Sequence, residues 1–207
     1  MKKIFFTLLS CAAILMVQAQ KPVLTKDINT VYISGTPTNY YAHNGWLYFA
    51  GAKAGVGTEL WRTDGTTKGT EFVKDIWVGA SYGSPANFGS LGKTLFFSAN
   101  DGTNGVELWK SDSAGTVLVK DIYAGTAYYS SPANLTPFNG KLYFSAANAD
   151  GRELWVTDGT DTGTKLVKDI YAGTGSSNPK EFKVVNNTLY FVATDISKGT
   201  EVWKTDG

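Results

Sequence analysis

The fold of this chain is decided by Glu59-Leu60-Trp61-Arg62-Thr63-Asp64-Gly65-Thr66, a stretch that returns at almost fixed intervals. Glu-Leu-Trp recurs at 107–109 and 153–155 and Glu-Val-Trp at 201–203, so the tryptophans are 48, 46 and 48 residues apart. Two other markers keep this period: Lys-Asp-Ile, ending at Ile28, Ile76, Ile122 and Ile170, and Leu-aromatic-Phe, at 47–49, 95–97, 142–144 and 189–191. A period in the forties made of short aromatic and β-branched runs is typical of propeller blades.

Turn residues divide each unit into four short strands. The first strand follows a proline placed ten residues before the leucine of the aromatic strand (Pro37, Pro85, Pro132, Pro179). Asn44-Gly45 and Asn139-Gly140 predict tight two-residue turns after that strand. The sequence therefore predicts an all-β propeller of four-stranded antiparallel blades. It amounts to about four blades: a lone strand in 20–28, units 29–76, 77–122 and 123–170, and an incomplete unit 171–207.

The third and fourth strands of each unit carry a recurring pair of opposite charges. If Trp61 faces Phe72, then Glu59 faces Lys74. The same alignment pairs Trp109 with Leu118, Glu107 with Lys120, Trp155 with Leu166 and Glu153 with Lys168. Opposite charges directly across two strands contribute roughly 0.2–1 kcal/mol each. We therefore expect the Glu–Lys pairs to stabilise the sheets rather than to perform chemistry.

The strand count is compatible with two arrangements of the ring. A strand at Val23–Ile28 can pair beside Glu201–Thr205 and close a small four-blade ring, which would hide both sheet edges. Alternatively, these residues form an open arc of a larger propeller, and the N-terminal strand closes against a blade outside this sequence. We favour the arc, because Asp206-Gly207 stops inside a turn whose sister copies lead into another strand.

The first 19 residues have the pattern of a signal peptide. Lys2 and Lys3 precede an apolar run from Ile4 to Val17, and small residues before Gln20 suit cleavage there. An alternative is a lipoprotein signal with Cys11 as the lipid-bearing residue. Without its leader the chain has 17 basic and 18 acidic residues and no cysteine. We expect one exported domain over 20–207, secreted or at the outer cell surface, without disulfides, transmembrane segment or nucleic-acid footprint.

These repeated elements resemble those of the bacterial exported proteins named for the ELWxxDGT repeat. The resemblance covers residues 26 to 207, through the tryptophan, Asp-Gly-Thr and Lys-Asp-Ile elements together. It implies a propeller-like array on secreted or cell-surface proteins, often with a type IX sorting tail. Ser111-Asp112-Ser113 departs from the Thr-Asp-Gly of the other units, and the sequence shows no sorting tail. The family carries no established catalytic residues, so the resemblance implies architecture and location only.

The candidate binding residues are aromatic side chains that break the repeat. Repeated aromatics are expected in the core, above all Trp61, Trp109, Trp155 and Trp203 with Phe49, Phe97, Phe144 and Phe191, and also Trp77, Tyr123 and Tyr171. Loop residues that differ between units are where a repeat protein places function. The candidates for a ligand-binding face are Tyr40, Tyr41, His43, Tyr82, Tyr128 and Tyr129. The alternative, that they are ordinary exposed loop side chains, stays open.

The sequence names no metal, cofactor or catalytic residue. The Asp-Gly-Thr turns, with Asp64, Asp158 and Asp206, are expected to be structural, because calcium needs six to eight oxygen ligands. The loop around Asp101 is the remaining calcium candidate. No nucleophile elbow or phosphate-binding loop is present. We therefore expect a non-enzymatic module that binds an unknown protein or glycan through inter-blade loops. The alternatives are a structural spacer and a hydrolase that uses two of Asp101, Asp150, Asp161 and Asp195.

Overall fold

The computed structural model describes residues 22–30, 34–125 and 128–207, so the proposed signal peptide and Cys11 lie outside the described residues. The described part contains fifteen strands and no helix, and hence no helix that is long and apolar enough to cross a membrane. The strands form four antiparallel sheets. The expectation of an all-β fold built from repeated antiparallel sheets is confirmed.

Each of the first three sheets has four strands in sequence order. The first contains β1 (Thr38–His43), β2 (Trp46–Lys53), β3 (Gly57–Thr63) and β4 (Glu71–Lys74). The second contains β5 (Ala86–Leu91), β6 (Thr94–Asn100), β7 (Val106–Asp112) and β8 (Gly115–Lys120). The third contains β9 (Ala133–Phe138), β10 (Lys141–Asn148), β11 (Gly151–Thr157) and β12 (Lys165–Lys168). The fourth has three strands, β13 (Lys180–Val185), β14 (Thr188–Asp195) and β15 (Gly199–Thr205).

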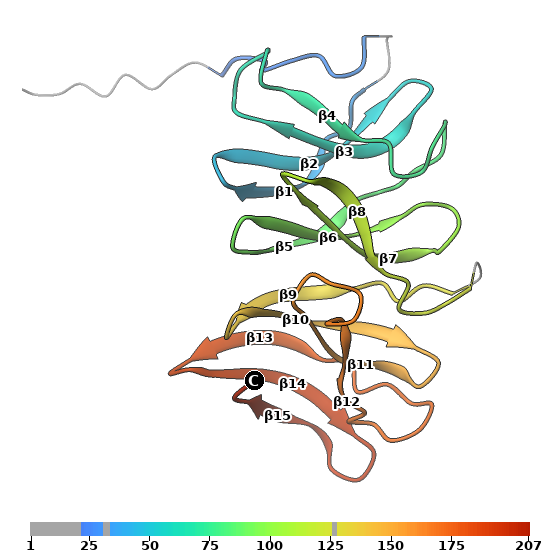
Figure 1. Ribbon diagram of the computed structural model, residues 1–207, viewed down its shortest axis with the longest axis vertical. Coiled ribbons are helices and arrows are strands. Elements are labelled where there is room, and N and C mark those ends of the chain that lie inside the picture. The colour runs from blue at the N-terminus through green and yellow to red at the C-terminus, as the bar shows by residue number, and fades with distance from the viewer. Residues whose placement is uncertain (1–21, 31–33, 126–127) are drawn as a thin grey trace, which may run out of the picture.

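The sheets follow one another along the long axis of the molecule (Figure 1). The inner strands β1, β5, β9 and β13 lie next to one another in that order. The first sheet is at one end and the fourth at the other, and no strand pairing joins them among the described residues. The described chain is therefore an open array and not a closed ring.

The predicted two-residue turns are present. Asn44 and Gly45 have φ values of 48° and 78°, and Asn139 and Gly140 have values of 50° and 71°. Positive φ at both positions is what a turn of this type requires, and Asn and Gly tolerate it best.

The predicted strand at Val23–Ile28 is absent, since residues 22–28 have no regular structure. In the complete units the corresponding strand pairs with a Glu-Leu-Trp strand, as β4 does with β3. Among the described residues no strand pairs with residues 22–28. They lie instead against the first sheet, where the Lys26 ammonium donates to the carbonyl oxygen of Thr70 at 2.8 Å.

The register predicted for the outer strands β4, β8 and β12 is right for one pair in each sheet and wrong for the other. Trp61 faces Phe72, Trp109 faces Leu118 and Trp155 faces Leu166, as expected. A bulge follows each of these pairs, so that Lys74, Lys120 and Lys168 face Leu60, Leu108 and Leu154. The predicted pairs Glu59–Lys74, Glu107–Lys120 and Glu153–Lys168 are therefore wrong. The extra residue of a bulge shifts every later pairing by one position.

The three glutamates are fully buried and bind backbone amides. Glu59 accepts hydrogen bonds from the amide of Ile76, just after β4, at 2.7 Å and from that of Gly83, in the loop to the next sheet, at 2.6 Å. Glu107 and Glu153 repeat this with Ile122 and Ser130, and with Ile170 and Ser177. We call this arrangement the glutamate junction. It joins an outer strand to the loop that starts the following sheet.

Apolar side chains fill the three spaces between neighbouring sheets. Between the first and second sheets, Tyr48, Leu60 and Ile76 pack against Phe97 and Trp109. The other two clusters repeat this with Phe96, Leu108 and Ile122 against Phe144 and Trp155, and with Tyr143, Leu154 and Ile170 against Phe191 and Trp203. Burial is thus confirmed for seven of the repeated aromatic side chains: Phe49, Trp61, Phe97, Trp109, Phe144, Trp155 and Phe191. Trp203 is only partly buried. The core prediction is wrong for Trp77, Tyr123 and Tyr171, which are half-buried and belong to the loops.

Candidate functional site

The loops that join consecutive sheets (β4–β5, β8–β9 and β12–β13) lie at the same end of the strands as the hairpin turns β2–β3, β6–β7 and β10–β11. Each loop passes close over one of these turns. A Cβ added to Gly57 would lie 1.5 Å from the carbonyl oxygen of Ser81, and one added to Gly151 would lie 1.7 Å from that of Gly175. We call this surface the loop end. The turns β1–β2, β5–β6 and β13–β14 lie on the opposite side, at the left in Figure 1.

Aromatic side chains gather at the loop end around the second sheet. The rings of Tyr123 and Tyr128 stack with their centroids 4.6 Å apart and their planes 7° from parallel. Trp77 lies over Gly102, where an added Cβ would come within 2.4 Å of the indole nitrogen. Gly105 stands equally close to Tyr129, since its Cβ would come within 2.6 Å of the ring. Glycines in the β6–β7 turn thus allow Trp77 and Tyr129 to approach it closely.

The candidate tyrosines of the loops remain open to solvent. Tyr82 is 63% exposed, and Tyr128 and Tyr129 are 49% and 50% exposed. Aromatic side chains give a large contact area for little loss of conformational entropy, which suits them to binding. The structure places Tyr128 and Tyr129 in one loop, and Tyr82 in the preceding loop at the same end.

A pocket of about 400 Å³ opens at the start of the inner strands on this end, and its lining includes the two cations Arg152 and Lys180 with Asn87, Asn134 and Asn178. Arg152 Nη1 donates to the carbonyl oxygen of Ser131 at 2.9 Å, and Nη2 to that of Ser130 at 3.1 Å. Burial lowers the pKa of Arg152. No described carboxylate forms an ion pair with it. A desolvated guanidinium without a carboxylate favours an anionic ligand.

Sequence reasoning missed Arg152, although the sequence carries a signal for it. The residue directly before the junction glutamate is Thr58, Val106 or Thr200 in the other units, so Arg152 breaks the repeat. The predicted binding residues were chosen from aromatic side chains in the loops, whereas Arg152 lies near the start of β11.

Tyr40, Tyr41 and His43 are not part of the loop end. All three lie on β1, and His43 is next to the β1–β2 turn at the opposite end. The Tyr41 hydroxyl lies 3.1 Å from that of Ser90, so this side chain links two inner strands. His43 Nε2 is buried without a hydrogen-bond partner among the described residues. The structure therefore separates the six candidates into a loop group and a β1 group.

The acids considered for a hydrolase are held within their own turns or paired with lysine. Burial alone would raise the pKa of Asp101, but bonds from the amides of Asn104 and Thr103 hold it below its ordinary value. The hydroxyl and amide of Ser197 similarly lower the pKa of Asp195. Asp161 lies in the β11–β12 turn, 3.1 Å from the Lys120 ammonium. A glycosidase acid needs a raised pKa, which neither Asp101 nor Asp195 has.

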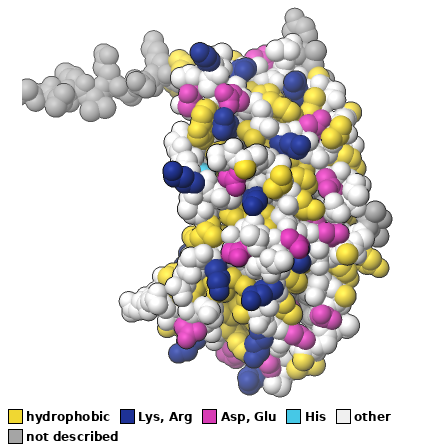
Figure 2. Space-filling model, viewed as in Figure 1, with side chains coloured by type: hydrophobic (Ala, Val, Ile, Leu, Met, Phe, Trp, Pro, Cys, Tyr) yellow, Lys and Arg dark blue, Asp and Glu magenta, His cyan; other side chains and the backbone are white. Residues whose placement is uncertain are grey.

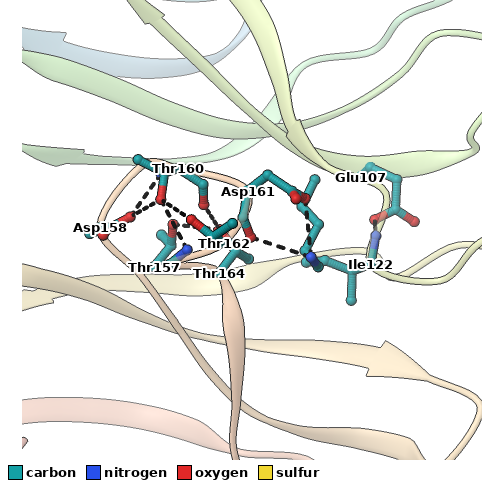
Figure 3. Close-up of polar contacts among 10 residues, drawn as sticks. Glu107, Ile122, Thr157, Asp158, Thr160, Asp161, Thr162 and Thr164 are labelled. Carbon is teal, nitrogen blue, oxygen red and sulfur yellow. Dashed lines mark hydrogen bonds and ion pairs between the residues drawn. The ribbon is translucent and has the colours of Figure 1, made fainter.

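The Asp-Gly-Thr turns use their carboxylates for local hydrogen bonds (Figure 3). Asp158 Oδ1 accepts from the amide and the hydroxyl of Thr160, at 2.9 and 2.7 Å, and Asp64 does the same with Thr66. These bonds lower the pKa of both aspartates. Among the described residues no group of three or more His, Cys, Asp or Glu side chains is arranged to hold a metal ion.

Charges are mixed over the visible face, where lysine and arginine alternate with aspartate and glutamate (Figure 2).

No protein-family model matches the chain, and no curated protein matches its sequence significantly. Among solved structures, a puromycin hydrolase (S511A mutant, complexed with PGG) is similar, with a TM-score of 0.52 and 15% identity. The similarity covers 78% of this chain and 25% of that one, so the chain spans about a quarter of the hydrolase. The identity is too low to indicate more than a shared fold.

Two further structures are similar at TM-scores of 0.49. The computationally designed protein Ika4 is 14% identical, over 88% of this chain and 98% of that one. One of two prolyl endopeptidases from a structural and mechanistic study is 12% identical, over 78% of this chain and 23% of that one.

Proposed function

We propose that this chain is an exported or cell-surface module that binds a glycan or protein ligand at its loop end, and that its sheets are blades of a β-propeller. The observation that carries the proposal is that repeated and non-repeated side chains of this chain occupy different places. Repeated side chains are used in the glutamate junctions, the turns and the inter-sheet cores. Four side chains that break the repeat lie at the loop end: Tyr82, Tyr128, Tyr129 and Arg152. Export itself rests on the leader pattern and on the resemblance to ELWxxDGT-repeat proteins.

The chemistry of the loop end favours a ligand with flat or apolar faces and an acidic group. Tyr128 and Tyr129 offer exposed rings that neighbouring groups hold in place. Arg152 offers a guanidinium that no described carboxylate neutralises. An acidic glycan combines both features, and a peptide with aromatic and acidic side chains does so as well.

A glycan array that includes acidic sugars tests this function. We expect the parent protein to bind a defined subset, and Tyr128→Ala/Tyr129→Ala and Arg152→Gln to lose that binding while keeping the parent's circular dichroism. Tyr40→Ala is the matched control, because Tyr40 is similarly exposed but lies on β1. Binding that survives the loop variants would refute the proposed surface.

Two alternatives give different results. A spacer that only positions another domain would bind nothing, with or without the substitutions. A hydrolase would release product in a broad substrate screen, and we propose that this chain is not an enzyme. The activities named for the similar structures belong to those proteins.

A further inference from the structure

The glutamate junction occurs three times complete and once divided between the two ends of the array. Glu201 is the fourth copy of the glutamate, and it is exposed without a hydrogen-bond partner among the described residues. Lys26-Asp27-Ile28 is the fourth copy of the triplet whose isoleucine amide binds that glutamate. Gly35 follows Ile28 at the same distance as Gly83 follows Ile76, and it accepts from the amide of Ala52 as Gly83 does from Asn100. Each end therefore carries one half of a junction.

The apolar core between sheets is divided in the same way. Val202 is 72% exposed, whereas its counterparts Leu60, Leu108 and Leu154 are at most 2% exposed. At the other end Leu47 is partly exposed, whereas its counterparts Leu95, Leu142 and Leu189 are fully buried. A hollow of about 330 Å³ with mainly apolar walls lies between the N-terminal segment and the first sheet. The exposed face of the fourth sheet, with Val202, and that of the first sheet, with Leu47, therefore correspond to the two halves of a fourth inter-sheet core.

The N-terminal segment already occupies the position of an outer strand relative to the sheet that follows it. Lys120, at the end of β8, donates to Asp161 in the β11–β12 turn of the next sheet. Lys26 donates to Thr70 beside the β3–β4 turn, and Thr67 in that turn donates to the carbonyl oxygen of Thr25 at 2.7 Å. Ile28 packs onto Gly51 of the first sheet. The segment thus lacks only the strand with which it would pair.

The two halves lie at opposite ends of the molecule (Figure 1), so one copy of this shape does not bring them together. We propose that a second copy of this chain supplies the missing half. β15 of one copy pairs with residues 23–28 of the other, with Leu24 facing Trp203 and Lys26 facing Val202. The Glu201 carboxylate then accepts hydrogen bonds from the amides of Ile28 and Gly35. Two such contacts join two arrays of four sheets into a closed ring of eight.

The strand register of the complete sheets shows which two residues should be changed to cysteine in a disulfide test. Lys74, Lys120 and Lys168 face Leu60, Leu108 and Leu154, which predicts that Lys26 faces Val202. Directly opposed residues have Cα atoms about 4.5–5.5 Å apart, within reach of a disulfide. We change Cys11, the single cysteine of the chain, to Ser and prepare Lys26→Cys and Val202→Cys separately, one with a tag.

Mixing the two variants under mild oxidation should give a disulfide-linked dimer with one copy of each, while either variant alone should not. Light scattering on the purified parent should show a dimer. Glu201→Ala should raise the dimer dissociation constant about tenfold or more, because a charged hydrogen-bond acceptor is lost. Glu71→Ala, an exposed glutamate on β4, should leave it unchanged. Circular dichroism checks that each variant is folded.

Three outcomes would overturn the proposal. A monomer whose Lys26→Cys/Val202→Cys form closes an internal disulfide would show that one copy completes its own ring. A monomer without any cross-link would show that the two faces do not pair. Species that grow beyond two copies would show an open chain of arrays. None of these results depends on ligand binding at the loop end, so the test is separate from that of the proposed function.

Discussion

Glu107 shows how a single buried side chain holds two sheets together. Its carboxylate accepts from the amides of Ile122 and Ser130, both at 2.9 Å, and from the Ser130 hydroxyl. An isolated buried charge is strongly unfavourable, and these donors compensate its loss of water. Ile122 lies just after β8, the last strand of one sheet, and Ser130 lies just before β9, the first strand of the next. The glutamate therefore stabilises the boundary between sheets.

Glu107→Gln should destabilise the protein by roughly 1–3 kcal/mol, the usual effect of leaving buried donors unsatisfied. Glutamine keeps one acceptor oxygen but turns an NH₂ group toward the remaining donor. Urea denaturation measures the change. Glu71→Gln is the control, because the exposed Arg62–Glu71 pair should contribute at most about 1 kcal/mol. Equal effects of the two substitutions would contradict a special role for the junction.

The pKa of Glu107 makes this effect depend on pH. Burial raises the pKa, and the hydrogen bonds from Ser130 and Ile122 offset only part of that rise. A raised folded-state pKa gives stability that is complete below the unfolded value, about 4.3, and is lost as pH rises through the folded value. The free energy of unfolding of the parent, minus that of Glu107→Gln, should thus increase as pH falls from neutral toward about 4. A decrease in this difference would mean that the hydrogen-bond donors lower the pKa of Glu107 more than burial raises it.

At the scale of elements, the hairpin turns of the loop end are shaped by the loops above them. Gly151 has a φ of 105°, and the carbonyl oxygen of Gly175 occupies the space of a side chain. Gly140, in the β9–β10 turn, has a φ of 71° and open space around it. The first glycine is required by φ and by contact, the second by φ alone.

Gly140→Ala should cost about 1–2 kcal/mol, the strain of a left-handed alanine. Gly151→Ala should cost more, because the loop must also move away from the new methyl group. Thermal unfolding of both variants measures the difference. Similar melting temperatures would mean that the β12–β13 loop does not pack against the turn.

The turns of the array should fold without calcium. Asp64, Asp158 and Asp101 each bind amides or hydroxyls of their own turn or loop. A chelator should therefore leave the melting temperature within about one or two degrees, since ligand-linked stability vanishes when no ion binds the native state. A fall of about ten degrees would make these aspartates ligands.

On the scale of the whole molecule, stability comes from the contacts between neighbouring sheets. Trp109 is 7% exposed and packs in the cluster between the first and second sheets. In arrays of this kind each repeat contacts only its neighbours, so stability is approximately a sum over repeats and interfaces. A defect in one interface should thus separate the array at that point.

Trp109→Ala should cost about 3–5 kcal/mol, as large aromatic deletions from a core do. Val117→Ala is the control, because Val117 lies on the outer strand β8 and is 48% exposed, and such positions usually change stability by less than about 0.5 kcal/mol. Denaturant unfolding followed by circular dichroism measures both. A parent-like Trp109→Ala would place the tryptophan outside the core.

Much of the fold was predictable because its signals are local. The alternation of Leu-aromatic-Phe with Glu-Leu-Trp predicted the strands, and Asn139-Gly140 predicted a turn with positive φ that the structure contains. The loop tyrosines were found because they break the repeat. Arg152 was missed because only the arrangement of the loop over β11 shows its burial and its carbonyl partners.

The sequence by itself determined the class of the fold and the order of the strands in the four sheets, since period and turn preference act over a few neighbouring residues. It also predicted a strand at Val23–Ile28 that the structure lacks. The tertiary structure alone decided what each charged side chain meets. A one-residue bulge turned Glu59 from Lys74 toward the amides of Ile76 and Gly83. The arrangement of the four sheets also leaves Glu201 and Ile28 at opposite ends of an open array. The physical reason is that burial and hydrogen-bond partners depend on residues far away in the chain, and no local pattern encodes them.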